Sequence, residues 1–154
     1  AGVEVRPFEV GSDEAAWTAR NNQAFTGLPD QVGWAVGEIG LREAEPGCDP
    51  LGFFRATRGG GLLGFHWTKV HPAGAGLGEV YIVGVDPSAQ ASGLGGLLTA
   101  VGIAHLARSL AGADEPTVML YVESDNTAAL RTYRRLGFRQ YSVDTAYARG
   151  GDTV

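Results

Sequence analysis

The chain has 154 residues, long enough for one domain with a sizeable core, and its 44% hydrophobic and 19% charged residues are typical of a soluble globular protein. The net charge of −5 argues against a nucleic-acid partner, because binding to phosphates requires clustered lysine and arginine. One cysteine cannot form an internal disulfide or a cysteine-based metal site, and no apolar run reaches the ~20 residues of a membrane span. We therefore expect a soluble, cytoplasmic protein that forms a single domain over residues 1–154, with no membrane partner.

The N-terminal part of the chain predicts a strand followed by two helices. Alternating side chains over residues 3–8 predict the strand, and Ser12 before two acidic residues predicts the N-cap of the first helix. Asp30 can cap the second helix, whose apolar residues keep a roughly helical spacing.

The middle of the chain predicts an antiparallel meander. Segments 51–58 and 62–70 are rich in aromatic and β-branched residues and flank three glycines, the pattern of a hairpin. A second glycine-rich turn leads into an apolar strand over residues 80–85.

The remainder predicts a long helix over about residues 93–110 and a buried strand over residues 117–122, parallel to its predecessor. Asn126 then caps a short helix that Gly137 ends, and residues 138–148 are expected to form two last strands. These elements define an α/β fold with a mixed, mostly antiparallel sheet of about six or seven strands, flanked by about four helices.

The stretch Glu79–Gly96 joins a strand, a glycine-rich loop and a helix start, which together make an anion site, most often for phosphate. A P-loop would require Lys-Ser/Thr after the last glycine, where Leu97 stands, and a dinucleotide fingerprint would require glycine in place of Gln90. The motif that this loop does contain is Gln90-x-x-Gly93-x-Gly95.

This loop resembles the acyl-CoA pyrophosphate loop of the GCN5-related N-acetyltransferases (GNAT). The later series of Asn126, Tyr133 and Leu136-Gly137-Phe138 is similar to the second part of that family's signature, so the resemblance covers essentially the whole chain. It implies a single GNAT domain with a splayed parallel strand pair, acetyl-CoA as co-substrate, and no metal.

Four segments are similar, more closely, to the C-terminal domain of the mycothiol synthase family. These segments are LLGFHWTKVHP (62–72), GLGEVYIVGVDP (76–87), LYVESDNTAALRTYRRLGF (120–138) and YSVDTAYA (141–148). That family acetylates the cysteinyl amine of Cys-GlcN-Ins and consists of two tandem acetyltransferase halves. Only one half is present here, which leaves open an excised domain whose partner is a second GNAT domain, or a single-domain relative.

The resemblance implies that Glu79 is the general base and Tyr133 the general acid. Glu79 lies roughly 13 Å along the strand from Val83, at ~3.3 Å per residue, so it is expected to act through water. From the residues alone, a solvated carboxylate at a strand start is the better interpretation of Glu79, and Tyr133 is a core aromatic whose hydroxyl requires a partner.

For acetyl-CoA, the resemblance implies that the backbone of Val83, Gly84 and Val85 pairs with the pantetheine arm, and that the Val83 N–H polarises the thioester carbonyl. The pyrophosphate is expected on the backbone amides of Gln90, Ala91, Ser92, Gly93, Leu94, Gly95 and Gly96. Asn126, Ala129 and Arg131 are expected to contact the pantetheine and phosphate end, although Asn126 is also a simple N-cap. Family members usually carry basic residues after the glutamine, whereas Ala91-Ser92 stand here.

For the acceptor, the resemblance points to Asp30, Lys69 and Tyr121 beside Glu79. Lys69 is the only lysine in the chain, but a solvated hairpin lysine and a helix-capping Asp30 are the alternatives. The three histidines show no metal-ligand spacing and are expected to be structural or surface residues.

Three functions remain open from the sequence. The first is acetyl transfer to a small aminothiol such as Cys-GlcN-Ins, and the second is acetyl transfer to another amine, such as a protein N-terminus, an antibiotic or a polyamine. The third is a non-catalytic acyl-CoA-binding half of a tandem protein, against which the presence of both Glu79 and Tyr133 argues.

Overall fold

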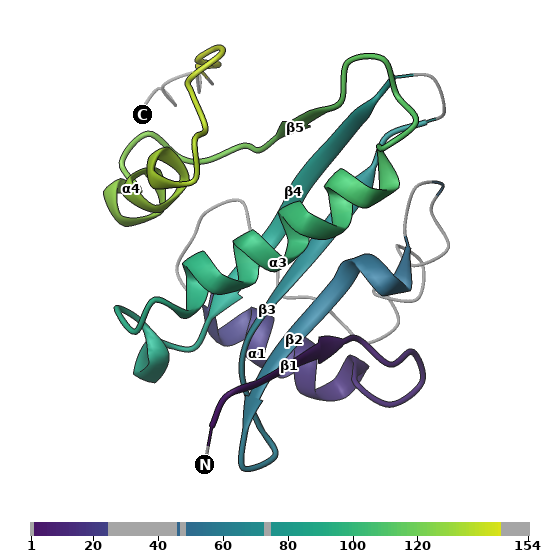
Figure 1. The fold of residues 1–154 in the computed structure, drawn as a ribbon. Coiled ribbons are helices and arrows are strands. Elements are labelled where there is room, and N and C mark those ends of the chain that lie inside the picture. Colours follow the sequence, from purple (N-terminus) through teal and green to yellow (C-terminus); the bar gives the residue numbers. More distant parts are fainter. Residues whose placement is uncertain (1, 25–45, 47–48, 73–74, 146–154) are drawn as a thin grey trace, which may run out of the picture.

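The computed structural model describes residues 2–24, 46, 49–72 and 75–145. Its elements are β1 (Glu4–Pro7), α1 (Glu14–Ala24), η1 (Pro50–Gly52), β2 (Phe53–Arg58), β3 (Gly61–Val70), β4 (Leu77–Val85), η2 (Pro87–Ala89), α3 (Leu94–Ser109), β5 (Thr117–Met119) and α4 (Thr127–Arg135). The strands form one sheet in the order β1-β2-β3-β4-β5, antiparallel except for the parallel pair β4-β5. Helix α3 lies on one face of this sheet and α1 on the other (Figure 1).

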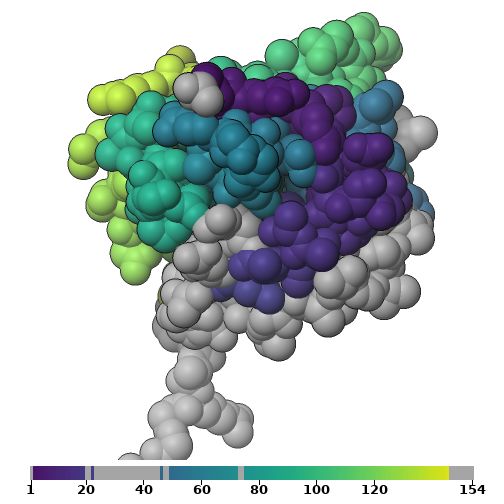
Figure 2. All heavy atoms as spheres, turned by 90° about the horizontal axis from the view of Figure 1, so that it is seen from below, coloured from purple at the N-terminus to yellow at the C-terminus, as the bar shows by residue number. Residues whose placement is uncertain are grey.

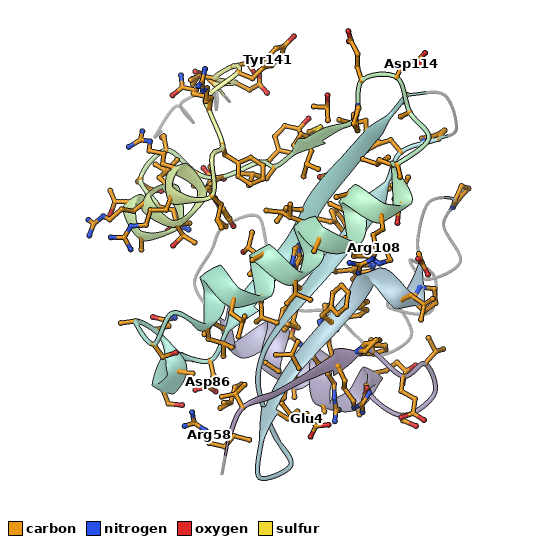
Figure 3. The ribbon with its side chains drawn as sticks, viewed as in Figure 1. Glu4, Arg58, Asp86, Arg108, Asp114 and Tyr141 are labelled. Carbon is orange, nitrogen blue, oxygen red and sulfur yellow. The ribbon has the colours of Figure 1, made fainter. Side chains whose placement is uncertain are left out.

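This architecture confirms the predicted fold class, with differences in the strands. The described part of the chain has five strands rather than six or seven, because residues 138–145 contain none. In that segment Tyr141 and Val143 are exposed, so it lacks the burial against a sheet that stabilises a strand. Tyr141 points away from the sheet at the far side of α4 (Figure 3). The strand expected over residues 117–122 ends at Met119, and the helix expected from Asp30 lies outside the described residues.

The hydrophobic core on the α1 face is an aromatic cluster. Its buried members are Phe8, Trp17, Phe53, Leu62, Phe65 and Trp67. Phe53 stacks on Phe8 and on Trp67, with ring centroids 4.1 and 4.7 Å apart, and Trp17 packs edge-on against them. The N-terminal segment that carries Phe8 runs along one edge of the molecule beside β2 (Figure 2).

Helix α1 is attached to the sheet by the buried carboxylate of Asp13. The Trp17 N–H donates to the Asp13 carbonyl at 2.9 Å, so Asp13 is the N-cap, and the prediction of Ser12 was wrong by one residue. The Asp13 carboxylate pairs with Arg6 at 3.0 Å and with Arg55, and these ion pairs to β1 and β2 fix the position of the helix start.

Helix α3 approaches the sheet closely at Gly102. A Cβ atom there would lie 2.0 Å from Cε1 of His66, which is fully buried on β3. The His66 Nδ1–H donates to the Leu98 carbonyl at 2.8 Å, whereas its Nε2 has no hydrogen bond in the described part of the chain. Burial lowers the pKa of His66 from 6.5 to about 4, so a neutral imidazole joins the sheet to α3.

No helix among the described residues is long and apolar enough to cross a membrane.

Candidate active site

Strands β4 and β5 diverge after three paired residues. The parallel register joins Leu77 to Thr117, Gly78 to Val118 and Glu79 to Met119. β4 then continues to Val85 without this partner, as Figure 1 shows. The predicted splayed pair is therefore confirmed. Beyond Glu79, the edge of β4 that faces away from β3 is not paired with β5, and we call this part of β4 the released edge.

A β-bulge at Tyr81 interrupts the pairing of β4 with β3. Trp67 pairs with Ile82 and Thr68 pairs with Val80, which leaves Tyr81 as an extra residue on β4. Gly84 lies outside the bulge, because it pairs in register with Phe65. Glycine is required at that position for another reason, since a Cβ would lie 2.5 Å from the Phe65 ring.

The bulge reverses which backbone groups of β4 face β3. The Leu77 carbonyl accepts from the His71 N–H at 2.9 Å, and the Asp86 N–H donates to the Leu63 carbonyl at 2.7 Å. In a regular strand, residues that face the same neighbour are separated by an even number, because backbone direction alternates. Leu77 and Asp86 are separated by nine, so the extra residue shifts the alternation. The backbone groups of Val83 and Val85 consequently face the released edge, where the pantetheine arm is expected.

The loop after β4 presents unbonded amide groups at the start of α3. Asp86 accepts from the Ser88 N–H at 2.7 Å where the chain turns out of the sheet (Figure 3). Gly93, with φ of +84°, is the N-cap and makes no side-chain capping bond. The first i→i−4 bond of the helix runs from the Leu97 N–H to the Gly93 carbonyl at 3.0 Å. The amides of residues 94–96 therefore lie at the positive end of α3, as an anion site requires.

In the described part of the chain, one non-glycine residue has a positive φ: Ala91, at +61°. Such a conformation costs about 1–2 kcal/mol for a residue with a Cβ. Ser92 donates from its hydroxyl to the Ala89 carbonyl at 2.6 Å, and Gln90, Ala91 and Ser92 are all exposed. The loop accordingly offers backbone amides and no side-chain cation.

Both ends of α4 are capped as predicted. The Asn126 side-chain oxygen accepts from the Ala129 N–H at 3.1 Å. At the other end Gly137 has φ of +93°, and the Phe138 N–H donates to the Tyr133 carbonyl at 3.1 Å in a Schellman motif. Arg131 is exposed on the surface of this helix.

The Schellman motif also fixes the ring of Tyr133. The ring lies edge-on to Phe138, with centroids 5.9 Å apart. Burial raises the pKa of Tyr133 above its ordinary value of 10.0, so the phenol is protonated at neutral pH, as a general acid requires. α4 lies against the start of α3, since a Cβ at Gly96 would meet Thr132 Cγ2 at 3.7 Å.

Glu79 is buried at 8% exposure on β4, directly opposite Lys69 on β3. His71 donates from Nε2 to Oε2 of Glu79 at 2.8 Å. His71 was expected to be a structural or surface residue, and its contact with Glu79 was not predicted. Its position two residues beyond Lys69, across the hairpin from Glu79, is a signal that could have identified it once the register was known.

The residues predicted for the acceptor are only partly brought together. Lys69 lies on the same face as Glu79, and its Nζ is 5.6 Å from the centre of the Tyr81 ring. Tyr121 is 74% exposed beyond the end of β5, and Asp30 lies outside the described residues.

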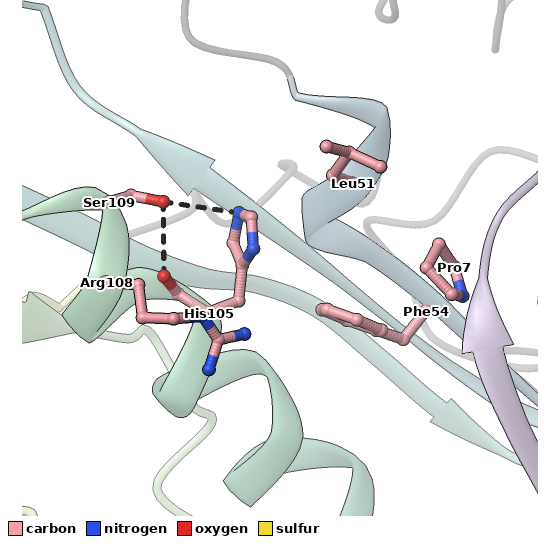
Figure 4. A pocket seen from close by; sticks show the side chains of 6 residues that line it. All are labelled: Pro7, Leu51, Phe54, His105, Arg108 and Ser109. Carbon is pink, nitrogen blue, oxygen red and sulfur yellow. Dashed lines mark hydrogen bonds between the residues drawn. The ribbon is translucent and has the colours of Figure 1, made fainter.

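A separate pocket on the α3 face contains none of the predicted site residues. It is lined by Pro7, Leu51, Phe54, His105, Arg108 and Ser109 (Figure 4). Nε2 of His105 is 3.3 Å from Asp49 Oδ2 and 3.4 Å from the Ser109 hydroxyl oxygen. A nucleophilic triad requires the serine and the carboxylate on opposite ring nitrogens, so this arrangement is not one. Over the described ranges, no three His, Cys, Asp or Glu residues gather as metal ligands.

Comparison with known proteins agrees with this fold. Residues 66–148 match the FR47-like protein family. The chain is 58% identical over 154 residues to a mycothiol acetyltransferase of Mycobacterium leprae, covering 96% of this chain and 50% of the relative. A putative GNAT-family acetyltransferase from Desulfovibrio desulfuricans superposes with a TM-score of 0.74 at 25% identity, covering 97% of this chain and 93% of that protein. The aminoglycoside N-acetyltransferase AAC(6')-Iy in complex with CoA gives 0.71 at 18% identity, with coverage of 96% and 95%.

The chain therefore belongs to the FR47-like family of the GNAT acetyltransferases. Its sequence is 57–58% identical to mycothiol acetyltransferases, and it spans about half the length of the curated relatives it matches.

Proposed function

We propose that this chain is an acetyl-CoA-dependent N-acetyltransferase that transfers acetyl directly to the amine of a small aminothiol such as Cys-GlcN-Ins. One observation carries the proposal: the bulge at Tyr81 turns the backbone of Val83 and Val85 to the edge that β5 leaves, immediately before the amide-rich start of α3. An extended acyl-pantetheine arm that ends in a pyrophosphate requires both features: a strand edge with which to pair, and backbone amides that bind the phosphates.

The residues present fit acetyl-CoA. Val83 and Val85 hold the pantetheine arm as an added strand, and the amides of residues 90–96 hold the pyrophosphate. Asn126, Ala129 and Arg131 contact the cofactor from α4. Gly84 leaves room for the ring of Phe65, because a Cβ at that position would lie 2.5 Å from it.

Glu79 and Tyr133 divide the proton transfers between them. Glu79 takes a proton from the substrate ammonium group through water, so that the neutral amine nitrogen can attack the thioester carbonyl, which the Val83 N–H polarises. The attached nitrogen loses its second proton to water, the carbon–sulfur bond breaks, and Tyr133 donates its hydroxyl proton to the departing thiolate and regains a proton from water. Burial of Tyr133 supports this role, because it keeps the phenol protonated.

The acceptor is inferred from the relatives and from the charges near Glu79. The similar proteins are named mycothiol acetyltransferases. Lys69 pairs with Glu79 on the neighbouring strand. Asp30, Lys69 and Tyr121 remain the candidates that contact the acceptor. A second GNAT domain is a candidate partner, because the relatives are twice as long.

The test is acetyl transfer to a panel of amines that includes Cys-GlcN-Ins, an N-terminal peptide, an aminoglycoside and a polyamine. The reaction is followed by the loss of thioester absorbance, because a thiol reagent would also react with the aminothiol. Preferential turnover of Cys-GlcN-Ins is expected. Preference for another amine would overturn the acceptor, and tight acetyl-CoA binding without any turnover would indicate a non-catalytic half.

A further inference from the structure

The general base proposed above is a buried carboxylate with a specific partner. Glu79 is 8% exposed, and its Oε2 accepts a hydrogen bond from Nε2 of His71 at 2.8 Å. The two residues come from different strands, since His71 directly follows β3 and Glu79 is on β4. The His71 backbone is fixed as well, because its N–H donates to the Leu77 carbonyl at 2.9 Å.

A hydrogen bond to one carboxylate oxygen restricts what the other oxygen can do. A free glutamate side chain has several rotamers, and most of them direct the carboxylate away from any one water molecule. With Oε2 held by His71, Oε1 remains the oxygen available to a substrate proton.

We propose that His71 is a positioning residue for acetyl transfer, which orients Glu79 through the hydrogen bond from its Nε2–H to Oε2 of the carboxylate. The proposal rests on the proposed function, because it requires Glu79 to accept the substrate proton. In each turnover the ammonium proton passes through water to Oε1, and the Nε2–H···Oε2 bond persists throughout. No proton is transferred to His71 during the reaction.

Other groups beside the pair are accounted for in the described part of the chain. Lys69 is the cross-strand neighbour of Glu79, and its ammonium group is 5.6 Å from the Tyr81 ring centre. Met119 is the residue of β5 that pairs with Glu79 and carries no charge.

The experiment compares His71→Ala with His71→Gln in the full chain, with acetyl-CoA and Cys-GlcN-Ins as substrates. The glutamine amide reproduces the Nε2–H donor but cannot be charged. We expect His71→Ala to lower kcat between about 10- and 100-fold with KM for acetyl-CoA changed less than about twofold, because the carboxylate is misoriented while the CoA site is intact. His71→Gln is expected to recover most of that loss.

The split between kcat and KM separates positioning from a merely structural role, because a general loosening of the fold would change both. His105→Gln is the matched control: the same change on the opposite face of the sheet, expected to leave kcat within about twofold of the wild type. Wild-type kcat in His71→Ala, a matching rise of KM in that variant, or no recovery in His71→Gln would each overturn the proposal.

If His71→Ala does not fold, His71→Leu replaces it, because leucine fills the space of the ring without supplying a hydrogen-bond donor. Failure of the proposed function is distinguishable, because wild-type protein would then acetylate no amine. Active wild-type protein with unaffected His71 variants would remove this inference and leave the acetyltransferase activity standing.

Discussion

Tyr81 and Ile82 are adjacent in the sequence, yet both side chains pack against the same aromatic core cluster on one face of the sheet. Consecutive residues of a regular strand point to opposite faces, so this pair marks the bulge in β4. The bulge decides which residues of β4 face β3 and which face the released edge. The proposed acyl-CoA site therefore depends on one inserted residue, Tyr81, whose side chain packs against the core.

The bulge predicts that proline is tolerated at residue 83 and not at residue 82. Proline removes a backbone N–H, which in Ile82 faces β3 and in Val83 faces the released edge. We expect Ile82→Pro to lower the free energy of unfolding by ~1–3 kcal/mol more than Val83→Pro does, because it leaves a buried polar group of β3 unpaired. The measurement is denaturant unfolding of both variants. Val83→Pro should be more stable than Ile82→Pro and still lose about 100- to 1,000-fold in kcat, because the oxyanion donor is gone. Equal destabilisation by the two prolines would contradict the assigned backbone directions.

Tyr133→Phe is expected to separate acid catalysis from packing. The phenyl ring keeps the edge-on contact with Phe138, so the unfolding free energy should change by less than ~0.5 kcal/mol. We expect kcat to fall about 100- to 10,000-fold with little change in KM for acetyl-CoA, measured by steady-state kinetics. Because burial raises the pKa of Tyr133, ionisation of this phenol should cause no loss of activity up to pH ~9 in the wild type. Undiminished kcat in Tyr133→Phe would remove its role as the acid.

His66 predicts a loss of stability in acid. Its pKa is about 4 in the folded protein and 6.5 in an unfolded chain, so the unfolded state binds the proton more readily. The contribution is fully present above pH 6.5 and is lost as the pH falls from 6.5 to 4, by about 3 kcal/mol in total.

The check is urea unfolding of the wild type and of His66→Asn at pH 7 and pH 4.5. The asparagine amide can still donate to the Leu98 carbonyl but does not titrate in this range. We expect the wild type to lose more unfolding free energy between the two pH values than the variant loses. Equal losses would show that another group causes the acid sensitivity.

The loop chemistry predicts that CoA binding depends weakly on salt. Gln90, Ala91 and Ser92 supply no cation, so amides and the helix dipole hold the pyrophosphate at short range. We expect Ser92→Arg to bind CoA more tightly at low salt and to lose that advantage at high salt, measured by calorimetry. Ser92→Ala is the control, because it removes the bond to the Ala89 carbonyl without adding charge. A steep salt dependence in the wild type would contradict this account.

The parts of the fold that the sequence predicted well are set by local chemistry. Gly93 and Gly137 adopt positive φ at helix ends, and Asn126 caps α4, so each could be recognised from residue type and spacing. The features that the sequence did not predict in the candidate site depend on pairing between residues that are distant in the sequence. Tyr81 carries no local signal of a bulge, and the contact between His71 and Glu79 requires the β3–β4 register. The roles assigned to the site residues remain predictions.

The most direct test of the central claim is an amide NMR titration of the chain with acetyl-CoA. The largest shifts are expected at the backbone amides of Val83 and Val85, on the released edge of β4, and at residues 93–96 at the start of α3. Ile82 and Gly84, whose amides face β3, should shift less than their two neighbours. Shifts centred on the pocket of Phe54 and Arg108, or equal shifts at Ile82 and Val83, would contradict the account.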